Sequence, residues 1–203
     1  MAPTQVYLLF DERMALHRPA FNPENPEYLP FENSNRIFKV YGRLLELERR
    51  LIAHSTSIND VMPSCERRFV EFMCRPVEQE TVELVHSREH YDWLYCTSLM
   101  GEEDLWGLTN PDDLFVCRST FLAASLACGG VVQCVNAVTS EETFSAGNRI
   151  TRAIALVRPP GHHAEFSRPM GELTELVAVV LLTLVLFLQS CLTVIQSRIL
   201  FLQ

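Results

Sequence analysis

The sequence predicts an α/β fold in which helices flank a parallel sheet. Two continuous apolar runs of strand length, residues 6–10 and 154–157, contain no charged residue, as is typical of strands that are covered on both faces. Between them, segments with helical spacing alternate with shorter apolar runs, and this alternation favours a parallel sheet over an antiparallel one.

The first apolar run is followed by a loop and a long helix. Residues 19–35 contain four prolines and four asparagines, so we expect little regular structure there. Asn35 is expected to cap a helix from residue 36 to about residue 52, because apolar side chains recur at helical spacing along it. These side chains are Ile37, Val40, Leu44, Leu47 and Leu51.

Three shorter elements come next. Residues 69–74 are expected to form a strand, and Pro76, a residue that ends regular pairing, stops it. Residues 78–85 are expected to form a short helix. Ser87 is expected to cap another helix that runs to about residue 99, because serine is a favoured helix N-cap.

The last part of the predicted domain contains a loop, a buried helix and a strand. Residues 101–113 are acidic and contain two glycines and a proline, so we expect a loop. Residues 120–138 are rich in alanine, leucine and valine and predict a buried helix, in which Gly129 and Gly130 indicate close helix packing. The second apolar run, residues 154–157, follows as a strand.

Composition limits the function classes. The chain has 203 residues, enough for one core, and its formal charge of −8 argues against a broad basic face for nucleic acid. Seven cysteines contain no Cys-x-x-Cys pair, and the N-terminus lacks a basic region and cleavage site typical of a signal peptide. We therefore expect an intracellular protein with reduced thiols and no direct nucleic-acid partner.

The segment Arg158-Pro-Pro-Gly-His-His-Ala-Glu165 is the strongest chemical feature. It follows a predicted buried strand, and ligands bind at the carboxyl ends of strands in open α/β sheets. His162 and His163 can accept and return protons near neutral pH. An irregular turn allows both imidazoles to face one pocket, whereas a strand would point them to opposite faces.

Residues 154–165 resemble the active-site segment of class II zinc-dependent histone deacetylases, and the Arg-Pro-Pro-Gly lead-in is typical of that class. The resemblance covers roughly residues 6–171. It departs from the family at Pro30, Phe31 and Ser34. Further matching positions are Tyr7 to Met14, Glu32 and Arg36, Val85-His86-Ser87 with Glu89, and Ser119-Thr120-Phe121.

This resemblance implies an arginase/deacetylase-type fold and hydrolysis of acetyl-lysine amides at one zinc ion. It implies that His163 is the general base and then the general acid, that His162 tunes the charge, and that Gly171 lines the substrate tunnel. The implied partners are acetylated lysines of histones or other proteins and a deacetylase complex. The implied setting is chromatin regulation in the nucleus, the cytoplasm or both.

The resemblance stops after Gly171. The family's zinc ligands, an Asp-x-His pair and a second aspartate, and its oxyanion-stabilising tyrosine lie further along the domain. Here no Asp-x-His occurs, and no aspartate, histidine or tyrosine follows Glu165. Because a zinc site takes about three protein ligands, we expect residues 1–171 to be the N-terminal part of a deacetylase domain that holds no catalytic zinc and has no deacetylase activity in this chain.

Residues 172–203 form an apolar tail unlike the family. Residues 176–197 carry no charge and are long enough to span a bilayer, so membrane contact is one expectation. The other is a retained intron or misplaced exon boundary, because Gly171-Glu172-Leu173 can be encoded with a splice-donor sequence. The genomic sequence beyond Gly171 distinguishes the two.

Three other functions remain open from the sequence. His86-Ser-Arg-Glu-His90 matches the inverted zinc-peptidase pattern, although a helix capped by Ser87 would leave His86 outside it. The chain is alternatively a non-catalytic interaction module or isoform. The third function is that of a small-molecule amidohydrolase, because related enzymes of that kind share the family fold.

An acidic cluster in residues 102–113 could attract a basic peptide.

Overall fold

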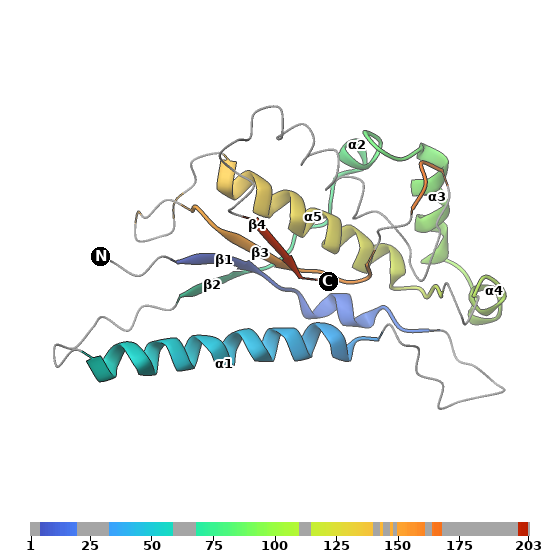
Figure 1. Cartoon of the computed structure of the whole chain (residues 1–203). Coiled ribbons are helices and arrows are strands. Elements are labelled where there is room, and N and C mark those ends of the chain that lie inside the picture. The colour runs from blue at the N-terminus through green and yellow to red at the C-terminus, as the bar shows by residue number, and fades with distance from the viewer. Residues whose placement is uncertain are drawn as a thin grey trace.

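The computed structural model describes residues 5–19, 33–58, 68–109, 115–139, 150–160, 164–167 and 199–202, together with residues 143 and 147. Within these residues, strands and helices alternate around one sheet (Figure 1). The domain boundary expected at residue 171 lies outside them, as do residues 176–197 of the apolar tail.

The sheet has four strands, all parallel, in the order β2-β1-β3-β4. Leu8 at the centre of β1 is level with Glu71 of β2 and Ile154 of β3. The parallel sheet predicted from the apolar runs is therefore confirmed. The strands are β1 (Val6–Leu9), β2 (Phe69–Phe72), β3 (Ala153–Leu156) and β4 (Ile199–Leu202).

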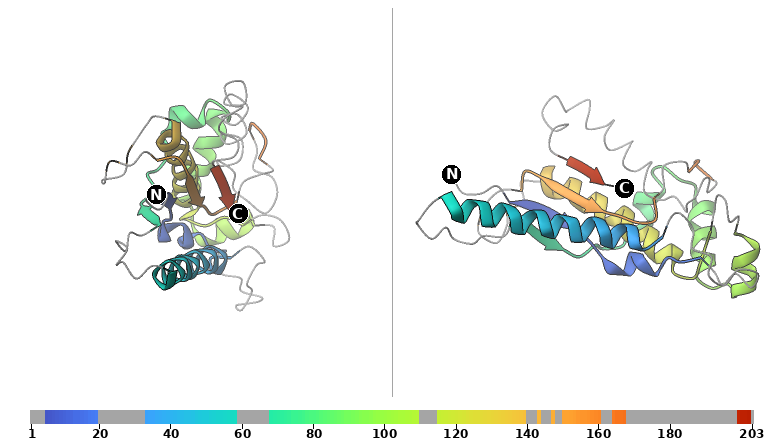
Figure 2. Two further views of the ribbon diagram at one scale, coloured as in Figure 1. Left: turned by 60° about the vertical axis from the view of Figure 1, so that its left-hand side comes forward. Right: turned by 60° about the horizontal axis from the view of Figure 1, so that its bottom comes forward.

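Two long helices cover opposite faces of the sheet, as Figures 1 and 2 show for α1 (Asn35–Ile58) and α5 (Thr120–Thr139). Helix α1 is amphipathic, and Ile37 on its inner side is buried with the sheet. Helix α5 is apolar on nearly all sides because sheet and helices surround it. It is long and apolar enough to cross a membrane by composition, but 72% of its apolar window is buried inside the protein.

The glycines of α5 allow a close approach, but to a loop rather than to a helix. A Cβ atom on Gly129 would lie 1.8 Å from the carbonyl oxygen of Arg75, and one on Gly130 would lie 2.8 Å from the Sγ atom of Cys74. Both neighbours belong to the segment that follows β2. Gly129 therefore lets α5 pack directly on the backbone of that segment, and Gly130 makes room for the Cys74 side chain.

Short helices connect the larger elements. Figure 1 shows η1 next to the end of β1 and the pair α2 and α3 beside α5. Ser87 accepts a hydrogen bond from the amide of His90 at 3.2 Å, which confirms it as an N-cap. The short helices are η1 (Glu12–Leu16, 3₁₀), α2 (Gln79–Val82), α3 (Arg88–Thr97) and α4 (Glu102–Gly107).

Two expectations need correction, and one strand was not predicted. Residues 102–107 form helix α4 instead of a loop, because acidic side chains in its first turn complement the positive end of the helix dipole. Helix α1 begins at Asn35 and extends to Ile58. At its start, the side-chain oxygen of Asn33 accepts a hydrogen bond from the backbone amide of Asn35, so Asn33 supplies the side-chain contact that was expected from Asn35. The apolar tail also supplies β4, so β3 has a neighbour on both sides.

Candidate functional site

The carboxyl ends of β1, β2 and β3 meet at one edge of the sheet, because the strands are parallel. Helix η1 follows β1 there, residues 73–77 follow β2, and residues 157–160 follow β3. The tandem histidines are expected at this edge. His162 and His163 themselves, and Gly171, lie outside the described residues, but the residues on both sides of the histidine pair are described.

Arg158 anchors the segment that leads to the histidine pair. Its side chain is only 2% exposed, and Nη1 donates hydrogen bonds to the carbonyl oxygens of Met14, at 3.1 Å, and His17. Its backbone amide lies 3.3 Å from the Sδ atom of Met14. The end of β3 is thereby tied to η1, which follows the neighbouring strand.

His17 is a buried partner of this anchor. Its Nδ1 atom lies 2.9 Å from the hydroxyl oxygen of Thr120, which also accepts the amide of Cys117 at 2.7 Å. The ring stacks on Phe115 with centroids 4.4 Å apart. Burial, and then the charge of Arg158, hold the pKa of His17 well below its usual value. The imidazole is therefore neutral, and its role here is structural.

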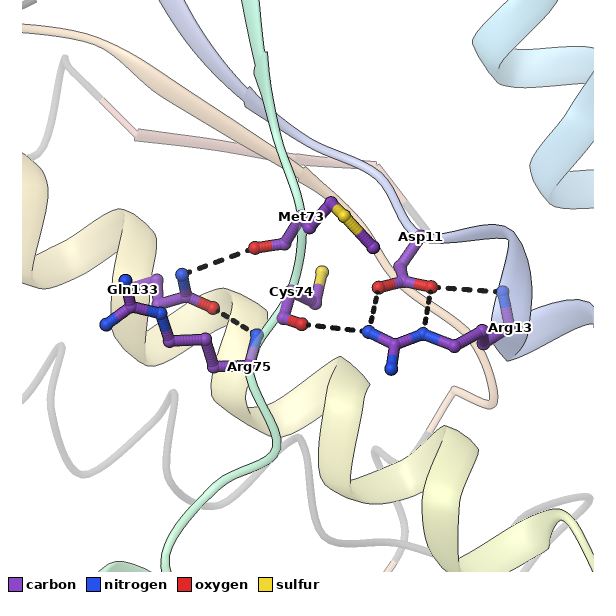
Figure 3. Close-up of polar contacts among 6 residues, drawn as sticks. All are labelled: Asp11, Arg13, Met73, Cys74, Arg75 and Gln133. Atoms are coloured by element: carbon purple, nitrogen blue, oxygen red, sulfur yellow. Dashed lines mark hydrogen bonds and ion pairs between the residues drawn. The ribbon is translucent and has the colours of Figure 1, made fainter.

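An ion pair fixes the start of η1, as Figure 3 shows. Both carboxylate oxygens of Asp11 accept hydrogen bonds from the guanidinium of Arg13, at 2.9 and 2.6 Å. Arg13 also donates to the carbonyl oxygen of Cys74 at 3.2 Å. Burial alone would raise the pKa of Asp11, but the hydrogen bonds and charge of Arg13 outweigh it and lower that pKa. This pair joins the ends of β1 and β2.

Helix α5 holds the same end of β2 from the other side (Figure 3). The side-chain oxygen of Gln133 accepts the amide hydrogen of Arg75 at 2.6 Å, and its nitrogen donates to the carbonyl of Met73 at 3.4 Å. The strand end is therefore fixed by η1 and by α5 together.

A pocket of about 410 Å³ opens between the residues that follow η1 and the start of α1. Two arginines and two asparagines contribute to its lining. Arg158 places this pocket directly beside the anchor of the histidine segment. The lining residues are His17, Arg18, Pro19, Asn33, Ser34, Asn35 and Arg158.

The residues that follow the histidine pair are held by the junction of α2 and α3. The Nδ1 atom of His86 lies 3.1 Å from the carbonyl oxygen of Glu165, and the amide of Ser87 donates to the carbonyl of Phe166 at 2.8 Å. Burial lowers the pKa of His86, although its hydrogen bonds to this segment act in the opposite direction. No sequence pattern indicates this contact, because its acceptors are backbone carbonyls, which every residue has.

The described residues do not fit a zinc ion. Among them, no group of three histidine, cysteine, aspartate or glutamate side chains is close enough together to hold a metal. The sequence has no Asp-x-His, and no aspartate or histidine follows Glu165. We therefore derive no catalytic step through zinc for this chain.

The geometry of residues 86–90 does not fit the zinc-peptidase alternative. The rings of His86 and His90 lie 5.0 Å apart between centroids and both are buried, but Glu89 is exposed. That pattern requires the glutamate to work as a base beside the metal-bound histidines. The three side chains therefore do not form one site.

The acidic cluster is a solvated surface where the structure describes it. Glu102, Glu103 and Asp104 lie exposed in the first turn of α4, where they stabilise the helix through its dipole. Asp112 and Asp113 lie outside the described residues.

Comparisons with known proteins agree on one family. Residues 32–172, more than half of the chain, match the histone deacetylase domain. Histone deacetylase HDA1 of Candida albicans is 30% identical over 171 residues, or 83% of this chain and 19% of that protein. Histone deacetylase clr3 of Schizosaccharomyces pombe is 30% identical over 165 residues, or 81% of this chain and 21% of that protein.

Another relative and a solved structure extend the comparison. Polyamine deacetylase HDAC10 of Homo sapiens is 35% identical over 107 residues, or 52% of this chain and 15% of that protein. The crystal structure of the HDA15 HD domain matches with a TM-score of 0.58 and 26% identity, covering 93% of this chain and 44% of that one. The chain thus spans about a fifth or less of the length of these relatives and under half of the solved domain.

Proposed function

This chain belongs to the histone deacetylase domain family, and we propose that it carries the tandem-histidine part of a lysine deacetylase site without a zinc centre of its own. The reaction class is hydrolysis of the amide bond of acetyl-lysine, in which a zinc ion polarises the amide and activates water when the family's site is complete. The chain's own contribution is a pair of imidazoles that accept and donate protons.

The placement of the described residues on both sides of the histidine pair is the observation that carries this proposal. Residues 157–160, which lead to the pair, follow β3 at the carboxyl edge of a parallel sheet, where such folds bind ligands. Arg158 is held by hydrogen bonds before the pair, and His86 with Ser87 holds Glu165 and Phe166 after it. We assign proton transfer to His163, charge tuning to His162 and the tunnel wall to Gly171. The Arg-Pro-Pro-Gly lead-in supports the class II type of site.

Two observations support the proposal that this chain is inactive: the described residues do not fit a zinc ion, and the sequence contains no Asp-x-His. Without a bound cation, neither the amide carbonyl nor the attacking water is activated, and a histidine pair alone supplies only part of the rate enhancement. The partners that follow from this function are acetylated lysines of histones or other proteins, in the nucleus, the cytoplasm or both, and a deacetylase complex.

A non-catalytic interaction module is the second candidate function. It is supported by apolar side chains of α1 that remain more than a third exposed, namely Phe38 at 43%, Leu47 at 45% and Leu51 at 38%. Apolar side chains on one exposed helix suit contact with another protein surface.

Acetate release from an acetyl-lysine peptide tests the proposal. We expect the purified 203-residue chain, with added zinc, to release no more acetate than the His162→Ala/His163→Ala double variant. Zinc-dependent release that disappears in the double variant would contradict the proposal. An acetylated polyamine run in parallel shows whether any release belongs to a small-molecule amidohydrolase instead.

A further inference from the structure

The junction of α2 and α3 contacts the chain directly after the tandem histidines, although it lies about 80 residues away in sequence. His86 reaches the carbonyl of Glu165, two residues after His163, and Ser87 reaches the carbonyl of the next residue, Phe166. Two adjacent donors thus hold two adjacent carbonyls. We propose that His86 is a positioning residue that fixes the tandem-histidine segment from its C-terminal side.

The chemistry of the contact fixes the proton on His86. A carbonyl oxygen only accepts hydrogen bonds, so Nδ1 of His86 carries the hydrogen and donates it to Glu165. The ring is 1% exposed and burial lowers its pKa, so it is neutral near pH 7. The Nε2 atom then holds a lone pair, buried and without a hydrogen-bond partner among the described residues.

The donor side of the contact is rigid. Ser87 uses its hydroxyl to cap α3 through the amide of His90, and its carbonyl accepts the amide of Tyr91 at 3.2 Å. Helix α3 then buries Leu94 and Thr97 in the protein. His86 is therefore attached to a helix whose position the core determines.

The other side of the segment is equally fixed. Arg158 is buried and bonded to the carbonyls of Met14 and His17 in the η1 region. Only six residues separate Arg158 from Glu165, and they include both histidines. Fixing both ends of a short segment limits the number of conformations open to the residues between them. A pair of proton-transfer side chains needs this restriction in order to keep its orientation. This inference rests on the proposed role of His162 and His163.

Nuclear magnetic resonance of the full chain tests the positioning role without substrate or metal. The imidazole ¹⁵N shifts of wild-type His86 should show a protonated Nδ1 and an unprotonated Nε2. His86→Phe keeps a flat ring but removes the donor, whereas His86→Asn keeps a donor of similar reach. His54→Ala, on the exposed side of α1, is the matched control.

We expect His86→Phe to lower the exchange protection of the Ser87 amide about threefold to tenfold, corrected for the altered neighbour, as expected for one lost hydrogen bond. It should also shift the imidazole signals of His162 and His163, while the amide of Val131 in α5 keeps its protection. His86→Asn should restore most of both effects, and His54→Ala should cause neither.

Three results would overturn the inference. One is an Nε2-protonated His86 in the wild-type chain, a measurement that does not depend on any variant folding. Another is unchanged His162 and His163 signals in His86→Phe. The third is equal loss of protection at Ser87 and Val131, which indicates general destabilisation. Since none of these readouts uses acetyl-lysine or zinc, they remain informative whatever the acetate-release assay shows.

Discussion

The carbonyl oxygen of Met14 accepts a hydrogen bond from Nη1 of Arg158 at 3.1 Å, across 144 residues of sequence. This contact joins helix η1, which follows β1, to the turn that follows β3. The segment that carries the tandem histidines therefore begins from a fixed point at the sheet edge. Stability and site geometry are coupled through this arginine.

Replacing this arginine should destabilise the fold. In Arg158→Leu, the carbonyls of Met14 and His17 lose a buried donor, and we expect a loss of about 1–3 kcal/mol in the free energy of unfolding by denaturant titration. The matched control is Arg88→Leu, because Arg88 is exposed and its ion pair with Asp92, at 3.6 Å, should contribute less than about 1 kcal/mol. Equal midpoints for the two variants would show that the buried contact contributes little.

The glycine contact between α5 and the segment after β2 predicts opposite outcomes for two identical substitutions. A methyl group on Gly129 would overlap the carbonyl oxygen of Arg75, so Gly129→Ala should cost about 1–3 kcal/mol. A methyl group on Gly42 in α1 meets nothing within 4 Å, so Gly42→Ala should stabilise by about 0.5–1 kcal/mol. Thermal unfolding measures both, and a Gly129→Ala chain as stable as wild type would refute the close approach.

The ion pair at the start of η1 should make the free energy of unfolding depend on pH in the acidic range. Folding lowers the pKa of Asp11 below its ordinary value near 3.8, so the unfolded chain binds its proton first as the pH falls. The contribution is present above pH 4 and is lost as the pH falls through the folded pKa. We expect Asp11→Asn to cost about 1–3 kcal/mol at pH 7 and progressively less below pH 4. A difference that is independent of pH would contradict the ion pair.

The buried His17 should add a second dependence at higher pH. Folding lowers its pKa well below 6.5, so between those values the unfolded chain binds a proton that the folded chain does not. Stability should therefore decrease as the pH falls from 7 to 5. His17→Phe keeps the stacking on Phe115 and should flatten this slope, leaving the smaller part that His86 contributes. Parallel stability curves for the variant and wild type would exclude a titrating His17.

Much of the fold could be predicted because buried strands and helices correspond to apolar segments of the sequence. Strands β1 and β3 lie where continuous apolar residues predicted them, and helix α5 lies where a segment rich in alanine, leucine and valine predicted it. Helix α4 was missed because its three acidic residues resemble a loop, although the same charges stabilise the first turn of a helix. Strand β4 could not be predicted, because its pairing depends on which strand edge is open beside it.

The site was predictable only where residue types carry the signal. The histidine pair and its Arg-Pro-Pro-Gly lead-in could be identified by their order in the chain. The partners of Arg158 and His86 are backbone carbonyls, which every residue has, so no sequence pattern indicates them. Likewise, the contact of Arg13 with the carbonyl of Cys74 depends on how the fold brings the two segments together, so Asp11 and Arg13 carry no sign of it in the sequence.

The zinc content of the purified chain tests the central claim most directly. After incubation with zinc and exhaustive dialysis, the 203-residue chain should retain far less than one zinc ion per molecule, with the same value for the His162→Ala/His163→Ala variant. This result is expected because the described residues offer no three-ligand group and no Asp-x-His occurs in the chain. One tightly held zinc ion per chain, lost when the two histidines are replaced, would contradict the account.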